Sequence, residues 1–244
     1  KQATDYFLLI GPPGTGKTSM ALQYLVREHE GKNILLLSYT NRAVDEICGM
    51  LADNNIAFLR LSKEYSCDSR FTDSLLTNAV KTNPTLEHIR QTIESSRIIV
   101  STTASLAIHT AIFSIKHFEL AIIDEASQIL EPNIVGLLAA HNGEKQVIDK
   151  FILIGDHKQL PAVVQQDNNE SAADSPLLEE IHLPNCANSL FERLILTERA
   201  AERNNFVGTL RKQGRMHPDI ATFPNTYFYV REQLECVPLA HQTE

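Results

Sequence analysis

The sequence predicts an α/β protein in which a mostly parallel sheet is covered by helices on both faces. Two patterns indicate this class. Short aliphatic runs recur along the chain and are apolar at almost every position, as strands are when both faces of a sheet are buried. Amphipathic helical stripes separate these runs, and strands that alternate with helices are typical of α/β architecture. The 244 residues, of which 43% are hydrophobic, suit one large core or one domain with part of another.

The expected strands follow one another from the first residues to position 209. They are Tyr6–Ile10, Ile34–Ser38, Ala57–Leu61, Arg97–Ser101, Leu120–Ile123, Phe151–Ile154 and Asn205–Thr209. Helical stripes follow the first and the second strand. These stripes are Ala21, Leu22, Leu25 and Val26, and then Ala43, Val44, Ile47, Cys48 and Leu51. Spacings of three and four residues place each set on one face of a helix.

Two segments depart from this alternation. Residues 62–96 are polar and carry only a weak helical stripe, so we expect a helical insertion there. Residues 165–188 are acidic and rich in turn-forming residues, which predicts a flexible surface loop. A boundary is expected after the last strand. Residues 1–210 are predicted to form one domain, and residues 211–244 to begin a second, incomplete one.

The composition narrows the class of protein. A net charge of −8 argues against a protein that coats nucleic acid nonspecifically, although amides and hydroxyls in one groove can still hold a strand. No apolar run reaches the roughly 18 residues that suggest a membrane span, and no secretory signal begins the chain, so no membrane partner is expected. The four cysteines lack metal-binding spacing and are interpreted as reduced thiols. We expect a cytoplasmic location, with the nucleus left open.

Residues 11–18 read GPPGTGKT and match the phosphate-loop pattern G-x-x-x-x-G-K-[ST] between a predicted strand and a predicted helix. Glycines let backbone N–H groups converge on phosphates, and a helix N-terminus adds positive potential. Lys17 is expected to reach the β- and γ-phosphates and Thr18 to hold Mg²⁺. The predicted nucleotide-binding residues are Gly11, Pro13, Gly14, Thr15, Gly16, Lys17, Thr18 and Ser19. The alternative, a glycine-rich turn without a ligand, is disfavoured by the complete motif in its proper setting.

A second motif follows about a hundred residues later, where the run AIIDE ends in two carboxylates. Asp124 is placed to bind Mg²⁺ together with Thr18, and Glu125 is placed to orient and deprotonate an attacking water. The alternative is structural, because Asp and Glu are also favoured at a helix start. The phosphate loop upstream favours the catalytic interpretation.

Further motifs resemble those of superfamily 1 helicases, in the branch that includes the nonsense-mediated-decay helicase and its DNA-processing relatives. They are DEASQ (124–128), IGDHKQLP (154–161), SLFERL (189–194) and QGRMHP (213–218). The resemblance implies a RecA-like P-loop NTPase domain followed by the opening of a second one. It also implies an ATP-dependent helicase or translocase that uses ATP and Mg²⁺ and acts on single-stranded nucleic acid.

The resemblance assigns roles to two more residues. Gln159 would sense the γ-phosphate, and the alternative is a turn-capping amide before Pro161. Arg215 would neutralise charge in the transition state, and the alternative is a surface or interdomain salt bridge. One position departs from the family, which usually has a tyrosine before this arginine to stack on adenine. Gly214 cannot stack, and Tyr6 or Tyr39 is a possible substitute.

Two predicted strands end in turns rich in hydroxyl and amide groups. Thr40, Asn41, Thr102 and Thr103 are the predicted contacts to a single strand, because small donors bind phosphate oxygens without reading base sequence. Helix N-capping is the alternative, especially for Asn41 and Thr103, and both roles are compatible. A grip on the backbone does not distinguish DNA from RNA.

Two other classes of protein also contain a phosphate loop. A P-loop regulatory ATPase or switch that acts on proteins would also use the Asp–Glu pair, but it would not need the GDHKQLP and QGRMHP segments. A nucleotide kinase is disfavoured by Glu125 and by the lack of a basic lid. Because a two-domain motor closes around ATP and the second half is nearly missing, the isolated chain is expected to bind nucleotide and to turn it over poorly.

Overall fold

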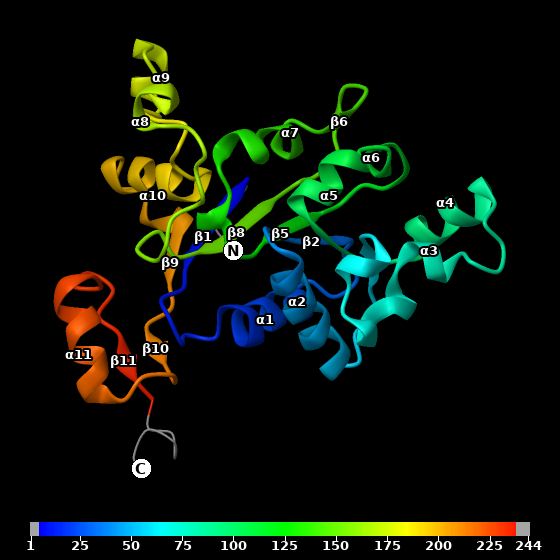
Figure 1. The fold of residues 1–244 in the computed structure, drawn as a ribbon, viewed down its shortest axis with the longest axis horizontal. Helices are drawn as coiled ribbons and strands as arrows, with labels where there is room; N and C mark the ends of the chain where they lie inside the picture. The colour runs from blue at the N-terminus through cyan, green and yellow to red at the C-terminus, as the bar shows by residue number, and fades with distance from the viewer. Residues whose placement is uncertain (1–4, 238–244) are drawn as a thin grey trace.

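The computed structural model describes residues 5–237 and contains one sheet of seven parallel strands (Figure 1). The strand order is β3-β4-β2-β5-β8-β1-β9. The strands are β1 (Tyr6–Ile10), β2 (Ile34–Ser38), β3 (Leu59–Leu61), β4 (Ile98–Thr102), β5 (Leu120–Ile123), β8 (Phe151–Gly155) and β9 (Val207–Thr209). The predicted α/β class is confirmed, and every predicted strand is present with its ends shifted by no more than two residues.

Helices cover both faces of the sheet, as Figure 1 shows. The π-helical turn η1 (Lys17–Leu22), α1 (Gln23–Glu28) and α2 (Asn41–Asp53) lie on one face. On the other face lie α5 (Thr103–Ile108), α6 (Ile112–Ile115), α7 (Val135–Leu138) and α10 (Leu190–Ala200). Alternate residues of β2 are buried on opposite faces of the sheet. Ile34 and Leu36 pack with α1 and α2, and Leu35 and Leu37 pack on the opposite side.

The predicted helical stripes supply the first of these layers. Leu22, Val26, Val44, Ile47 and Leu51 are all less than 2% exposed and belong to one apolar cluster. Burial of side chains this size stabilises by about 1.5–3 kcal/mol each relative to exposure, so the stripes fix how α1 and α2 dock.

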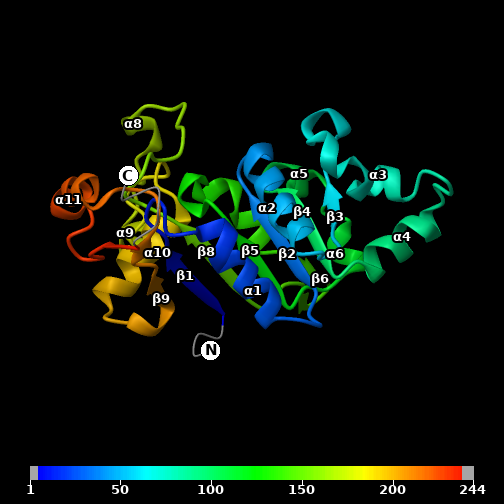
Figure 2. The same cartoon turned by 90° about the horizontal axis from the view of Figure 1, so that it is seen from below.

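Residues 62–96 contain the short helices α3 (Leu76–Ala79) and α4 (Leu86–Ser95) and the 3₁₀ turns η2 (Glu64–Ser66) and η3 (Ser69–Ser74). They lie at the β3 end of the sheet in both views (Figures 1 and 2). Arg60 of β3 anchors the segment: its fully buried guanidinium pairs with Asp45 of α2 and donates to the Ser66 carbonyl at 3.0 Å.

Residues 165–188 carry two short helices, α8 (Asn168–Ser171) and α9 (Pro176–Glu180). Backbone bonds close this segment, from Ala173 N–H to the Pro184 oxygen at 2.9 Å and from Cys186 N–H to the Ser171 oxygen at 2.8 Å. The segment is therefore folded locally. Its flexibility stays a prediction.

The chain leaves the main sheet after β9 and forms a small β-α-β unit at its end. β10 (Lys212–Gln213) pairs in parallel with β11 (Glu235–Cys236), and α11 (Pro218–Tyr227) connects them. Figures 1 and 2 place this unit at the end of the molecule opposite α3 and α4. The remaining elements are the hairpin β6 (His141–Asn142) and β7 (Lys145–Gln146) and the 3₁₀ turns η4 (Ala126–Gln128), η5 (Glu131–Asn133) and η6 (Asn204–Phe206).

None of the helices within residues 5–237 combines the length and the apolar character that crossing a membrane requires. The four cysteines are all free, as the interpretation of reduced thiols expects.

Candidate nucleotide-binding site

The phosphate loop joins β1 to η1 at the carboxyl edge of the sheet, where ligands of open α/β sheets bind. Gly14 has φ +77°, and a Cβ atom there would lie 2.5 Å from the Cβ of Arg215. At Gly11 a Cβ atom would lie 2.2 Å from Cγ of Lys17. Gly14 is required by its positive φ and by the approach of Arg215, and Gly11 is required by the approach of Lys17.

A cavity of about 270 Å³ lies over this loop. It brings together side chains that are far apart in the sequence, from the loop, the end of β5, the end of β8 and the segment after β10. Its lining residues are Pro12, Pro13, Gly14, Thr15, Gly16, Lys17, Thr18, Ser19, Glu46, Glu125, Gln159 and Arg215. Four of the five predicted catalytic residues line it, and the fifth, Asp124, is bonded to Thr18.

Lys17 is held inside the loop. Its ammonium group donates to the Gly11 carbonyl at 2.9 Å and lies 3.8 Å from a carboxylate oxygen of Glu125. The side chain is 12% exposed. A positive charge thus stands between the loop and the predicted general base, where a terminal phosphate would place its oxygens.

Asp124 ends β5 with its carboxylate 1% exposed. It accepts hydrogen bonds from the Thr18 hydroxyl at 2.6 Å and from the Glu125 N–H at 3.0 Å. Burial nevertheless raises the pKa of Asp124, because neither of these bonds nor the charge of Lys17 fully offsets the loss of water. A buried carboxylate in this condition favours a nearby cation.

The donor set fits Mg²⁺, which prefers carboxylate, hydroxyl, water and phosphate oxygens. Thr18 and Asp124 supply two such groups side by side. Within residues 5–237 no cluster of three or more His, Cys, Asp or Glu side chains could hold a metal ion by itself. A metal here would therefore depend on phosphate oxygens and water for its remaining ligands.

Glu125 has an unusual backbone for a non-glycine residue, with φ +52° in the left-handed region. Such a conformation costs on the order of 1 kcal/mol or more and is found preferentially at functional sites. Burial raises the pKa of Glu125, and the neighbouring charges of Asp124, Asp156 and Glu46 add to the shift against the opposing Lys17. Glu125 precedes η4, but its side chain makes no capping bond, so the structural alternative gains no support.

Gln159 reaches the same cavity from the loop after β8. Its amide nitrogen donates to Asp156 at 2.7 Å, and its backbone N–H closes a turn onto the Asp156 carbonyl at 3.2 Å. The residue therefore stabilises a turn and also faces the predicted phosphate site, and the two interpretations coexist.

Arg215 lines the same cavity, and its backbone lies against Gly14 of the loop. The chain is held there by a bond from Gly214 N–H to the Gly14 carbonyl at 3.0 Å and by a bond from Arg215 N–H to the Gln213 side chain at 2.9 Å. Its exposed guanidinium forms no ion pair with any residue between 5 and 237, so no surface salt bridge is present there, and a salt bridge to a further domain stays an alternative.

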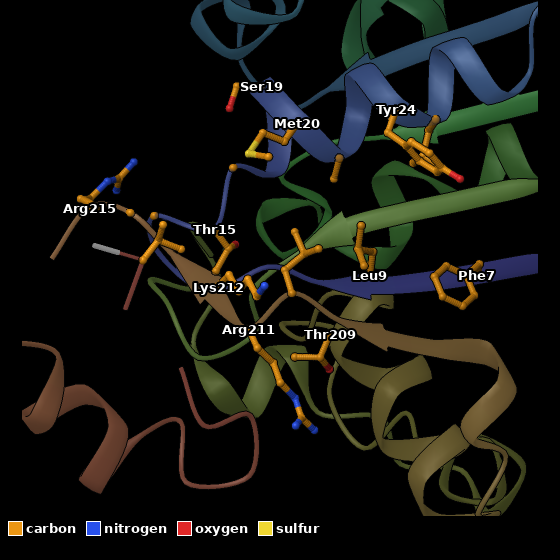
Figure 3. A pocket seen from close by; sticks show the side chains of 17 residues that line it. Phe7, Leu9, Thr15, Ser19, Met20, Tyr24, Thr209, Arg211, Lys212 and Arg215 are labelled. Carbon is orange, nitrogen blue, oxygen red and sulfur yellow. The ribbon is translucent and has the colours of Figure 1, made fainter. Parts of the chain in front are cut away.

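A second, larger cavity of about 1290 Å³ adjoins the first and shares part of the phosphate loop with it (Figure 3). Figure 3 shows it between the helix that carries Met20 and Tyr24 and the strand that carries Phe7 and Leu9. Its lining is Phe7, Leu9, Gly14, Thr15, Gly16, Ser19, Met20, Ala21, Tyr24, Leu25, Thr209, Leu210, Arg211, Lys212, Gly214, Arg215 and Val237.

The aromatic side chains of this cavity were missed from the sequence. Tyr24 is 63% exposed and stands four residues after Met20 on the helix that the phosphate loop opens. That spacing places both side chains on one face of the helix, and both line this cavity together with Gly214. The spacing of Met20 and Tyr24 could have been recognised from the sequence. Neither of the suggested substitutes lies here: the Tyr6 hydroxyl bonds Glu198, and Tyr39 lines a separate cavity.

The predicted strand contacts lie at the carboxyl ends of β2 and β4, which are neighbours in the sheet. The capping residues are Thr40 and Thr102, whose hydroxyls accept from the N–H groups of Ala43 at 3.2 Å and Ser105 at 3.0 Å. The assignment of capping to Asn41 and Thr103 is therefore wrong by one residue, since each begins its helix. Thr40 and Asn41 are exposed, whereas Thr102 and Thr103 are 6% and 7% exposed.

Comparison with known proteins adds family information to this geometry. Two family models, both described as AAA domain, match residues 1–85 with 77–167 and residues 186–244. The chain is 36% identical over 239 residues to the DNA replication ATP-dependent helicase/nuclease DNA2 of Bos taurus. It is 34% identical over 238 residues to the DNA2 protein of Saccharomyces cerevisiae. These matches cover 95% and 96% of this chain but only 20% and 14% of those proteins.

A solved structure shares the fold. Arterivirus nonstructural protein 10, a helicase in complex with DNA, superposes with a TM-score of 0.54 at 16% identity. The match covers 96% of this chain and 42% of the viral one. At this level of identity the likeness concerns the fold alone.

Proposed function

We propose that this chain, which belongs to the AAA-domain family, is the first RecA-like domain of a superfamily 1 helicase, binds and hydrolyses ATP, and couples hydrolysis to a single nucleic-acid strand. The observation that carries the proposal is the convergence of Lys17, Glu125, Gln159 and Arg215 on one cavity, with the Thr18–Asp124 pair at its side. The family membership rests on the match to residues 1–85 and 77–167.

Each side chain has a distinct task in this proposal. The loop amides and Lys17 hold the phosphates, and Glu125 accepts a proton from the attacking water. A raised pKa suits that task, because a stronger base accepts a proton more readily. Arg215 offers positive charge where the transition state becomes more negative, and Gln159 offers a neutral amide toward the terminal phosphate.

Thr18 and Asp124 would hold Mg²⁺. When bound, the ion would neutralise charge on the phosphate oxygens. The hydrogen bond between the two residues sets their oxygens side by side before the ion arrives.

We place the nucleobase in the larger cavity, against Tyr24 and Met20. An aromatic ring and a thioether both make favourable contacts with a flat π-system. Gly214 lines the same cavity, so Tyr24 would replace the ring that the family usually carries at that position.

The strand would lie over the ends of β2 and β4, where Thr40 and Asn41 are exposed and Thr102 and Thr103 lie close behind. We favour DNA over RNA because the curated relatives are DNA-replication helicase/nucleases.

A second RecA-like domain would continue from the terminal β-α-β unit. The main sheet ends with Val207–Thr209, and a separate parallel pair begins at Lys212. Around α11 the large apolar side chains are exposed: Ile220, Phe223, Tyr227, Phe228 and Val230. An apolar face of this kind suits burial against further elements of the same domain. Because the proposed ligands, ATP and nucleic acid, occur inside the cell, we infer an intracellular location.

The proposal is tested by measuring ATP hydrolysis with and without single-stranded DNA and RNA, in the chain and in a longer form that includes the following domain. We expect weak turnover by the chain and stimulation of the longer form by DNA. If neither polymer changes the turnover of the longer form, a regulatory ATPase that acts on proteins becomes the better interpretation. Equal stimulation by RNA would remove the preference for DNA.

A further inference from the structure

A buried carboxylate links the predicted γ-phosphate sensor to the end of the chain. Asp156 follows β8 and is 1% exposed. One of its oxygens accepts from the Gln159 amide at 2.7 Å and from the Tyr229 hydroxyl at 2.6 Å. Its backbone N–H donates to the Ser127 hydroxyl at 3.2 Å, two residues after Glu125. Asp156 thus contacts the sensor, the segment of the general base and the unit that contains α11.

A second set of contacts ties the same loop to the same unit. Lys158 donates to the Glu232 carboxylate at 2.5 Å and to the Phe228 carbonyl at 2.8 Å. Arg199 of α10 also reaches Glu232, at 3.1 Å. The Glu232 side chain is 1% exposed, so this interaction is largely screened from water. These contacts tie the loop that carries Gln159 to residues 228–232.

These contacts determine how the Gln159 amide is oriented beside the predicted phosphate site. An ionised carboxylate only accepts, so the nitrogen of the Gln159 amide must face Asp156. That nitrogen carries two N–H groups, so one is not needed by Asp156, and Gln159 is among the residues that line the cavity over the phosphate loop. Tyr229 donates to the same oxygen of Asp156 and is 4% exposed. Burial and the bond to Asp156 raise the pKa of the Tyr229 hydroxyl well above its ordinary value, so it remains a donor.

We propose that Tyr229 is a positioning residue for Gln159: through Asp156 it fixes the amide that faces the terminal phosphate, and with the Lys158–Glu232 pair it couples that phosphate to the unit after β10. The inference rests on the proposed function, because it takes the cavity over the phosphate loop as the γ-phosphate site. Tyr229 does not line that cavity, so its effect is indirect.

The test is the ratio of the Kd for ADP to the Kd for ATPγS, measured by calorimetry with Mg²⁺ on the chain and its variants. Gln159→Ala removes the sensor, and Tyr229→Phe removes only one hydroxyl. We expect Tyr229→Phe to lower the ratio by about threefold to tenfold, the factor of one lost or misplaced hydrogen bond, and to leave the Kd for ADP unchanged. Tyr227→Phe is the matched control, because Tyr227 lies on α11 and is 69% exposed. It should change neither Kd.

The double variant separates positioning from general destabilisation. If Tyr229 acts through Gln159, then Gln159→Ala with Tyr229→Phe loses no more discrimination than Gln159→Ala alone. Additive losses, or an equal loss of affinity for both nucleotides, would overturn the proposal. Glu232→Gln gives a second route if Tyr229→Phe folds poorly, because it keeps the shape of the side chain and removes the charge that Lys158 binds. It should lower the ratio in the same way, and an unchanged ratio would count against the coupling.

Failure of this inference is distinct from failure of the proposed function. If the unaltered chain binds neither nucleotide, both ideas fall. If it binds both equally, the inference about Tyr229 and Gln159 falls, and the proposed hydrolysis is judged by the turnover assay alone. If it discriminates and Gln159→Ala abolishes the discrimination while Tyr229→Phe retains it, the phosphate sensor stands and the role of Tyr229 is refuted.

Discussion

The carboxyl edge of the sheet carries two polar regions that are built differently. At the ends of β1, β5 and β8 lie buried charges and a strained residue, Glu125, whose φ is +52°. At the ends of β2 and β4 lie neutral hydroxyls, such as Thr40 and Thr102, that accept from the first turns of their own helices. The first region carries strain and buried charge that folding does not need, which indicates function. The second serves the fold whether or not a strand binds, so its geometry alone does not separate structure from recognition.

The largest effect is expected from substituting Glu125, the proposed general base of the first region. Glu125→Gln keeps the shape of the side chain and removes its ability to accept a proton. We expect ATP hydrolysis to fall by about 10²–10⁴-fold while ATP still binds, as measured by single-turnover phosphate release and calorimetry. Glu30→Gln, at an exposed position, is the control and should change neither. Loss of binding in Glu125→Gln would instead make the residue structural.

Lys17→Ala is expected to have the next largest effect. It removes the only ammonium group among the residues that line the phosphate cavity, whose lining contains one lysine and one arginine. Hydrolysis should fall by about 10²–10³-fold, and the affinity for ATP should fall more than the affinity for ADP. Lys32→Ala, on the exposed surface, should behave as the unaltered chain. Unchanged turnover in Lys17→Ala would refute the assignment of the phosphate loop.

The pH dependence of hydrolysis tests whether Glu125 of the first region is buried as described. Glu125 accepts a proton only when ionised, so the rate falls as pH drops below its pKa in the folded protein. Because burial raises that pKa, the fall should begin at a higher pH than the ordinary value for a glutamate allows. A profile of kcat/KM against pH, which reports the pKa values of the free enzyme, checks this. A profile whose acidic limb matches that of a solvent-exposed glutamate would contradict the environment described for Glu125.

A smaller effect is expected from the nucleobase cavity. Tyr24→Ala should weaken ADP binding by about tenfold, because it removes a stacking surface, and should leave the binding of inorganic tripolyphosphate unchanged. Tyr24→Phe keeps the ring and should bind both ligands normally. If the affinity for tripolyphosphate falls equally, Tyr24 supports the loop rather than the base.

Motif spacing explains why one part of the site was easier to predict from the sequence than another. Lys17, Thr18, Asp124 and Glu125 stand in short contiguous motifs at the ends of apolar strands, so local chemistry and strand order suffice to place them. The bond between Asp156 and Tyr229 joins residues 73 positions apart, and it depends on how the terminal unit docks. No local pattern encodes such a contact. Tyr24 lies between these cases, since its helical spacing from Met20 was visible but its cavity was not.

Thr40 and Thr102 give the smallest and most discriminating test of the second region. Each hydroxyl caps a helix, so Thr40→Ala and Thr102→Ala should each lower the free energy of unfolding by about 1 kcal/mol, measured by urea denaturation. Only Thr40 is exposed, whereas Thr102 is 6% exposed. Thr40→Ala should therefore also weaken the binding of labelled single-stranded DNA by about twofold to tenfold at low salt, and Thr102→Ala should not. Thr40→Ser keeps both the cap and the donor and should restore both properties. Equal losses of strand affinity in the two alanine variants would mean that the hydroxyls act through their helices, and the strand would then have to be held elsewhere on this edge.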